Sequence, residues 1–164
     1  MIKTIIVDDE EHCTDSLMRL INASGDALFV VAKCTSVRQA KDAIVTLNPD
    51  VVFLDVHLEN ETGFELLEQL PKIDFELIFT TAFDTYAVEA FRFSALDYLL
   101  KPIAASDFAT TITKIKQKIG LKDTAKKLEI LFHNFEERTD GLKKIAVPTV
   151  DGITFLSILD IEVI

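Results

Sequence analysis

Acidic side chains stand directly after two short apolar runs of the chain. Asp8 and Asp9 follow Ile5-Ile6-Val7. Asp55 follows Val51-Val52-Phe53-Leu54. Carboxylates gathered in one cleft repel each other unless a cation joins them. Mg²⁺ suits such a cleft, because it prefers oxygen ligands and keeps several waters, so that a few carboxylates suffice. The aspartates therefore predict a magnesium site, with Mn²⁺ as an alternative ion.

A hydroxyl and an ammonium group follow two later apolar runs. Thr81, with the small Ala82 beside it, comes after one run, and Lys101 ends the other, just before Pro102. A divalent cation, a lysine and a hydroxyl around one carboxylate form an arrangement that binds a phosphoryl group, since phosphoryl transfer depends mainly on positioning and charge neutralisation. Asp55, at a strand end before a polar loop, is the best-placed nucleophile.

Five apolar runs of strand length alternate with five segments of helical periodicity. The expected strands cover residues 5–7, 28–32, 51–54, 77–79 and 96–100, and the expected helices cover 10–23, 36–47, 64–70, 85–91 and 106–119. Ser36 and Ser106 stand where they are expected to cap helices. The polar stretch 57–63 is expected to be a loop. This alternation predicts an α/β fold with a parallel sheet and helices on both of its faces.

The carboxyl ends of parallel strands share one edge of a sheet, where ligands bind. The sequence therefore predicts that six residues from four strands meet there: Asp8, Asp9, Asp55, Thr80, Thr81 and Lys101. After Gly120 the pattern changes. Residues 122–135 predict further helix, 136–141 a polar linker, and 145–164 strands around a turn at Asp151-Gly152. The last segment is too short to bury a core of its own.

The 164 residues include 27 acidic and 17 basic side chains, for a net charge of −10. Such a chain is not expected to hold nucleic acid by bulk electrostatics. The sequence contains neither an apolar run of about 20 residues nor a signal-peptide pattern, so a cytoplasmic location is expected. Cys13 and Cys34 lack zinc or redox spacing and are expected to be reduced thiols. His12 is expected to be a surface residue without ligand-type partners.

The polar residues at the strand ends resemble those of the receiver domain of two-component response regulators. Asp8-Asp9, Asp55, Thr81-Ala82 and Lys101-Pro102 follow the first, third, fourth and fifth expected strands, in that family's order and spacing. The resemblance covers residues 1–121. It implies a doubly wound, five-stranded parallel sheet of the flavodoxin-like receiver fold, with strand order 2-1-3-4-5.

The resemblance also implies a function for the acidic residues. Asp55 would accept a phosphoryl group from a sensor histidine kinase. Asp8, Asp9 and Asp55, together with the backbone carbonyl of His57, would hold Mg²⁺. The chain would then be a signalling switch that catalyses only its own phosphorylation and dephosphorylation, rather than an enzyme acting on other substrates.

Further roles are implied for residues of the fourth and fifth strands. Lys101 would pair with a phosphoryl oxygen, and Thr81 would hydrogen-bond another, with Ala82 leaving room beside it. The bond before Pro102 is usually cis in the family. Tyr98 occupies the position of an aromatic switch residue, which would rotate inward when Thr81 moves towards the phosphoryl group.

Two segments of the sequence indicate which subfamily of response regulators the chain resembles. Residues 79–91 and 97–102 resemble regulators of the LytR/AlgR-like group, which carry a LytTR-type DNA-binding domain. Residues 143–164 resemble the first strands of that domain, after a helical extension and linker at 122–142. The resemblance implies a homodimer formed through the elements at 85–91, 96–100 and 106–119. Residues 143–164 carry two lysines against Asp151, Asp160 and Glu162, so DNA binding is expected only from a complete output domain.

One position departs from the family, and other functions remain open on this type of fold. Glu59 stands where a proline is common, four residues after Asp55, which puts kinase preference and phosphoryl lifetime in doubt. A phosphoaspartate-type hydrolase would have a second aspartate where His57 stands. A flavin carrier would have a phosphate-binding loop where Asp8 and Asp9 stand. A phosphorylation-independent binding module would lack some of the acidic residues or Lys101, and none is missing.

Overall fold

The computed structural model describes residues 1–25, 27–138, 144–149 and 152–157, and burial of side chains up to residue 130. The chain divides into two units, Met1–Ile119 and Gly120–Ile164. Within the described residues, no helix is both long enough and apolar enough to cross a membrane.

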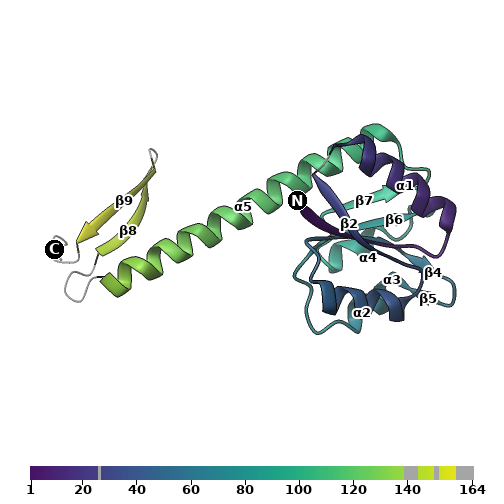
Figure 1. The fold of residues 1–164 in the computed structure, drawn as a ribbon, viewed down its shortest axis with the longest axis horizontal. Helices are drawn as coiled ribbons and strands as arrows, with labels where there is room; N and C mark the ends of the chain where they lie inside the picture. Colours follow the sequence, from purple (N-terminus) through teal and green to yellow (C-terminus); the bar gives the residue numbers. More distant parts are fainter. Residues whose placement is uncertain (26, 139–143, 150–151, 158–164) are drawn as a thin grey trace. The chain divides into compact units, whose positions relative to one another are not determined.

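The first unit is built on a five-stranded parallel sheet (Figure 1). Its order is β2-β1-β3-β6-β7, which confirms the expected order 2-1-3-4-5, with β6 and β7 as the fourth and fifth parallel strands. The strands are β1 (Ile2–Val7), β2 (Leu28–Cys34), β3 (Val51–Asp55), β6 (Glu76–Thr81) and β7 (Asp97–Leu100). Every neighbouring pair in this sheet is parallel.

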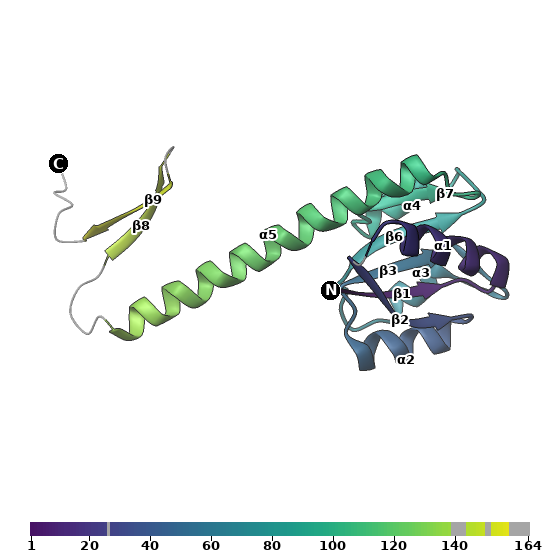
Figure 2. The ribbon, with the colours of Figure 1, turned by 45° about the horizontal axis from the view of Figure 1, so that its top comes forward.

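Helices cover both faces of the sheet, as expected (Figure 2). They are α1 (Glu11–Ala23), α2 (Val37–Leu47), α3 (Gly63–Glu68), α4 (Ala87–Arg92) and α5 (Ala105–Arg138). Successive strand residues point to opposite faces. In β3, Val52 and Leu54 accordingly join one apolar cluster with α2, α3 and α4, while Val51 and Phe53 join a second with α1 and the first part of α5. All four of these side chains are fully buried.

Local signals in the sequence explain where α2 and α3 begin and end. The side chain of Ser36 accepts a hydrogen bond from the backbone N–H of Gln39, as expected of an N-cap. Asn48 ends α2 in the left-handed conformation at φ 46°, which asparagine tolerates better than most residues. Thr62 and Glu65 form a reciprocal capping box at the start of α3.

Three local predictions are wrong. The expected loop at 57–63 contains a short antiparallel pair, β4 (His57–Leu58) with β5 (Glu61–Thr62). The helix α5 begins at Ala105, so that Ser106 lies inside it and donates to Asp107 Oδ1 at 3.4 Å instead of capping. The expected helix over 122–135 is confirmed, and it is continuous with α5 through Gly120, because one glycine in a helix costs only about 1 kcal/mol. The expected linker at 136–141 is wrong at its start, since α5 runs to Arg138.

The second unit contains an antiparallel pair, β8 (Lys144–Thr149) with β9 (Gly152–Ser157). Strands in this region were expected, and Gly152 is the first residue of β9 rather than part of the turn. The rest of the expected turn and residues 158–164 lie outside the described residues.

Asp97 ties β7 to α5. Its Oδ2 accepts hydrogen bonds from Thr111 Oγ1 at 2.6 Å and Lys114 Nζ at 2.9 Å. Its Oδ1 accepts the backbone N–H of Tyr98 at 3.1 Å. Burial by itself would raise the pKa of Asp97, but the hydrogen bonds to its carboxylate outweigh burial and lower the pKa below 3.8. The ionised form of Asp97 is therefore favoured by folding.

We predict that Asp97→Asn lowers the free energy of unfolding by about 1–3 kcal/mol at neutral pH, since hydrogen bonds to a charged partner are lost. A lowered folded-state pKa gives stability that is present above the unfolded pKa and is lost as pH falls through the folded one. The deficit should therefore shrink below about pH 4. Urea unfolding across pH checks this, with the exposed Asp123→Asn as control. A deficit independent of pH would contradict it.

Candidate functional site

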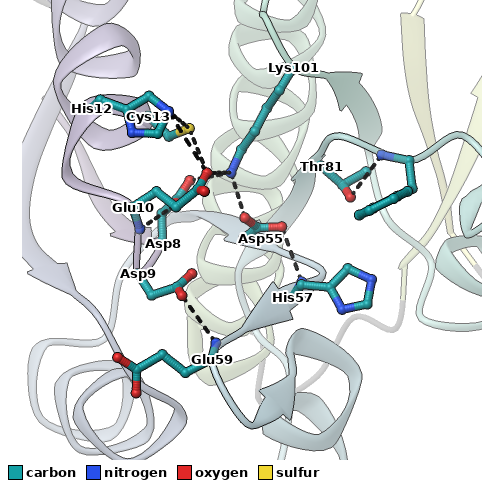
Figure 3. A network of polar contacts seen from close by, with 11 residues as sticks. Asp8, Asp9, Glu10, His12, Cys13, Asp55, His57, Glu59, Thr81 and Lys101 are labelled. Carbon is teal, nitrogen blue, oxygen red and sulfur yellow. Dashed lines mark hydrogen bonds and ion pairs between the residues drawn. The ribbon is translucent and has the colours of Figure 1, made fainter.

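The carboxyl edge of the sheet brings together the acidic residues predicted to bind a metal (Figure 3). Asp8 and Asp9 follow β1, and Asp55 is the last residue of β3. One carboxylate oxygen from each lies within 4.8 Å of the others. Asp8 and Asp55 are buried, and Asp9 is half-buried. The prediction that these three side chains meet is therefore confirmed.

Lys101 joins two of these carboxylates. Its Nζ lies 2.7 Å from Asp8 Oδ2 and 2.5 Å from Asp55 Oδ2, and its side chain is only 12% exposed. Glu10 lies farther from the same ammonium group, at 3.9 Å. In this conformation the lysine is the cation that offsets the repulsion between Asp8 and Asp55.

Burial and ion pairing have opposite effects on the pKa values of Asp55 and Lys101. Burial raises the pKa of Asp55, although its hydrogen bonds with Lys101 and the N–H of His57 favour the ionised form. Burial alone would lower the pKa of Lys101, but hydrogen bonds to Asp55 and Asp8 outweigh it and raise the pKa well above 10.5. Lys101 therefore stays protonated at neutral pH.

The β4–β5 segment positions Asp9 and Asp55 through its backbone. The N–H of His57 donates to Asp55 Oδ1 at 3.1 Å, and the N–H of Glu59 donates to Asp9 Oδ2 at 3.1 Å. Glu59 adopts φ 45°, a conformation closed to proline. The departure from the family pattern at this position thus supplies an N–H donor that a proline would lack. The exposed ring of His57 contacts Phe83 at a centroid distance of 5.2 Å.

Gly63 is a site residue that the sequence analysis did not identify. A Cβ atom at this position would overlap the backbone carbonyl oxygen of Asp55 and the side chain of Leu54. Its N–H donates to the carbonyl of Val56 at 2.9 Å. The start of α3 can lie this close to Asp55 only because the residue is glycine. The sequence signal that could have identified this residue is a glycine in the polar segment that follows Asp55.

The residues predicted to sense a phosphoryl group lie at the end of β6 and within β7. Thr81 is fully buried, and its Oγ1 accepts the N–H of Phe83 at 3.3 Å. Ala82, between them, is exposed. Tyr98 is half-buried and donates its hydroxyl to the backbone carbonyl of Phe83. Thr81 and Tyr98 thus hold the same residue of the segment after β6.

The Lys101–Pro102 peptide bond is cis, as the family resemblance implied. The backbone N–H of Lys101 donates to the carbonyl of Thr81 at 2.8 Å. The lysine is therefore attached to the end of β6 by its backbone and to the ends of β1 and β3 by its side chain.

The donor set fits a hard divalent cation. Asp8, Asp9 and Asp55 offer oxygen ligands only, and each of the three carboxylates accepts a hydrogen bond from a backbone N–H group. Such oxygen ligands suit Mg²⁺ or Mn²⁺ rather than softer metals. The backbone carbonyl of His57, two residues after Asp55, stays a predicted fourth ligand.

The expectation that His12 lacks ligand-type partners is wrong. Its Nε2 lies 3.4 Å from Cys13 Sγ and 4.0 Å from Glu10 Oε2. Sequence spacing did not indicate this, because Glu10 precedes the first turn of α1 and turns its carboxylate back over that turn to accept from Cys13 at 3.1 Å. Burial, together with that hydrogen bond, raises the pKa of the Cys13 thiol to about 11. Both cysteines are free thiols.

Comparison with known proteins gives close relatives. The chain is 37% identical over 160 residues to an uncharacterized response regulatory protein of Yersinia pestis, covering 96% of this chain and 66% of the relative. It is 31% identical over 167 residues to the sensory transduction protein LytT of Bacillus anthracis, and the alignment covers 98% of this chain and 64% of that relative. The chain thus spans just under two thirds of the length of these relatives.

Solved structures resemble the first unit. The response regulatory domain of protein mrkE from Klebsiella pneumoniae aligns with a TM-score of 0.65 at 28% identity, covering 71% of this chain and 96% of that one. The receiver domain of AraT from Geobacillus stearothermophilus aligns with a TM-score of 0.65 at 28% identity, covering 74% and 98%. The family model for the response regulator receiver domain matches residues 4–113. The chain therefore belongs to the response regulator receiver family, whose members act as signalling switches.

Proposed function

We propose that this receiver takes up a phosphoryl group on Asp55 from a phosphohistidine of a sensor histidine kinase, in a Mg²⁺-dependent reaction. The observation that carries the proposal is the position of the Asp55 carboxylate. It is buried at the carboxyl edge of the sheet, 2.5 Å from the Lys101 ammonium group and in reach of two further aspartates. A carboxylate so placed has a cation ready to receive the charge of an incoming phosphoryl group.

In the proposed reaction an oxygen of Asp55 attacks phosphorus as the phosphorus–nitrogen bond of the donor breaks. The electron pair of that bond leaves with the imidazole. When bound to Asp8, Asp9 and Asp55, Mg²⁺ supplies charge neutralisation for the phosphoryl oxygens. Lys101 now contacts the Asp55 oxygen; after transfer its ammonium group pairs with a phosphoryl oxygen instead. The exchange needs only a short movement of a long, flexible side chain.

Signal output would start at the segment after β6. The Thr81 hydroxyl now accepts from the Phe83 N–H, and donating to a phosphoryl oxygen would draw that segment towards Asp55. Tyr98 follows because its hydroxyl is bonded to the Phe83 carbonyl. Moving these groups would change the surface of α4 and β7, where Val88 and Phe91 are each 79% exposed and Leu100 is 48% exposed. We assign homodimer formation to this surface, together with α5.

The output is proposed to be transcriptional. Relatives include the sensory transduction protein LytT and, at 36% identity over 126 residues, the transcriptional regulatory protein BtsR of Salmonella typhi. We assign residues 1–121 to the receiver, 122–142 to a helical extension and linker, and 143–164 to the beginning of a LytTR-type DNA-binding domain. The antiparallel β8–β9 pair is compatible with that assignment. DNA contact is assigned to the complete output domain alone.

We predict that acetyl phosphate with Mg²⁺ adds one phosphoryl mass to the chain and that Asp55→Asn abolishes the addition, because the amide is not a nucleophile of this kind. Intact-mass spectrometry checks this, with the exposed Asp42→Asn as the matched control that keeps the addition. A phosphoryl mass that persists in Asp55→Asn would refute the assignment.

We predict opposite effects of two substitutions on Mg²⁺ affinity. Asp9→Asn should weaken binding at least about tenfold, because a charged ligand is lost. Lys101→Met should strengthen binding several-fold, because the ammonium group no longer competes for Asp8 and Asp55. Isothermal titration measures both, and circular dichroism verifies that each variant is folded. Unchanged affinity in both variants would place the metal elsewhere.

We predict that a beryllofluoride phosphoryl mimic promotes dimer formation and that Phe91→Glu reduces the dimer at least about tenfold, since it buries a charge in an apolar contact. Val45→Glu, at a 55% exposed position on α2, is the matched control and should dimerise normally. Sedimentation equilibrium gives the dissociation constants. Equal dimerisation of the two variants would remove α4 from the interface.

A further inference from the structure

We propose that Glu10, His12 and Cys13 form a second metal site, distinct from the aspartate site and selective for a borderline-soft divalent ion such as Zn²⁺. The proposal is independent of the phosphorylation chemistry of Asp55. It starts from the composition of the chain, which has only three histidines and two cysteines. One of each lies in the first turn of α1, beside a carboxylate (Figure 3).

The three donor atoms are already spaced for one small ion. Glu10 Oε2 is 3.1 Å from Cys13 Sγ, Cys13 Sγ is 3.4 Å from His12 Nε2, and His12 Nε2 is 4.0 Å from Glu10 Oε2. Tetrahedral Zn²⁺ has bonds of about 2.3 Å to sulfur and about 2.0–2.2 Å to nitrogen and oxygen. Donor atoms bound at those lengths lie between about 3 and 4 Å apart. The observed separations therefore require only small side-chain rotations.

The types of donor separate this site from the aspartate site. Imidazole and thiolate favour zinc-like ions, whereas carboxylates alone favour Mg²⁺. The sequence thus places a hard site and a softer one on neighbouring residues at the start of the chain. The two sites adjoin, because the backbone N–H of Glu10 donates to Asp8 Oδ1 at 3.0 Å and Lys101 lies 3.9 Å from Glu10 and 2.7 Å from Asp8. The two sets of proposed ligands have no residue in common, so filling one site does not remove a ligand from the other.

The site is accessible and keeps room for water. The side chain of Glu10 is 53% exposed and that of His12 is 79% exposed. The three residues also border a surface cavity that extends to the aspartate site, since its lining includes Asp8 and Lys101. Three protein ligands with water in the fourth position complete a tetrahedron. Binding releases the Cys13 thiol proton to solvent, so charge and protons balance.

Co²⁺ is the probe that tests the proposal, because Co²⁺–thiolate bonds give a charge-transfer absorption that carboxylate ligands do not give. The full chain is titrated with Co²⁺ under reducing conditions in excess Mg²⁺. We expect one equivalent per chain to produce the thiolate band, and Zn²⁺ to displace it. A stoichiometry of one ion per two chains, or no band, would overturn the proposal.

Matched variants identify the residues that produce the Co²⁺–thiolate absorption band. Cys13→Ser should abolish it, and His12→Ala should weaken Co²⁺ binding at least about tenfold, equivalent to about 1.4 kcal/mol. Cys34→Ala, at the other cysteine, and Asp9→Asn, in the aspartate site, should leave the band intact. Circular dichroism verifies that each variant folds. A band that survives in Cys13→Ser, or disappears in a folded Cys34→Ala or Asp9→Asn, would also overturn the proposal.

Discussion

The central constraint in this receiver is the repulsion among carboxylates that the sheet topology forces to one edge. Asp8 and Asp55 are both buried and come from adjacent parallel strands, β1 and β3. Two such charges persist side by side only with a cation between them. In the present conformation that cation is Lys101, which reaches both carboxylates from the far end of β7. Any divalent ion or phosphoryl group that enters the site must rearrange this ion pair.

The backbone around the site limits how that rearrangement proceeds. The N–H groups of His57 and Glu59 hold Asp55 and Asp9. Gly63 allows the start of α3 to pass directly behind the Asp55 backbone. On the other side, Thr81 and Tyr98 both bind Phe83. The acidic side of the site is therefore fixed by backbone donors, while the hydroxyl side depends on two bonds to one residue.

The two faces of the sheet are packed by different sets of helices. On the face covered by α2, α3 and α4, Tyr86, in the segment between Phe83 and α4, packs against the apolar cluster. In the same cluster Phe64 packs against Phe79 at a ring-centroid distance of 5.0 Å. The face covered by α1 and α5 is anchored by Asp97, which accepts from Thr111 and Lys114. The second unit contains the β8–β9 pair, and α5 is the element whose residues belong to both units.

The sequence by itself determined the parallel sheet, its helices and the convergence of Asp8, Asp9, Asp55 and Lys101 at its carboxyl edge. Alternating apolar runs and helical periodicity are local properties, and parallel strands necessarily place their carboxyl ends together. Only the tertiary structure showed that Lys101 bridges Asp8 and Asp55, that Glu59 donates to Asp9, that Ser106 lies inside α5, and that Glu10, His12 and Cys13 converge. These depend on side-chain direction and on contacts between residues far apart in the chain, such as Asp9 and Glu59, which spacing along the sequence does not encode.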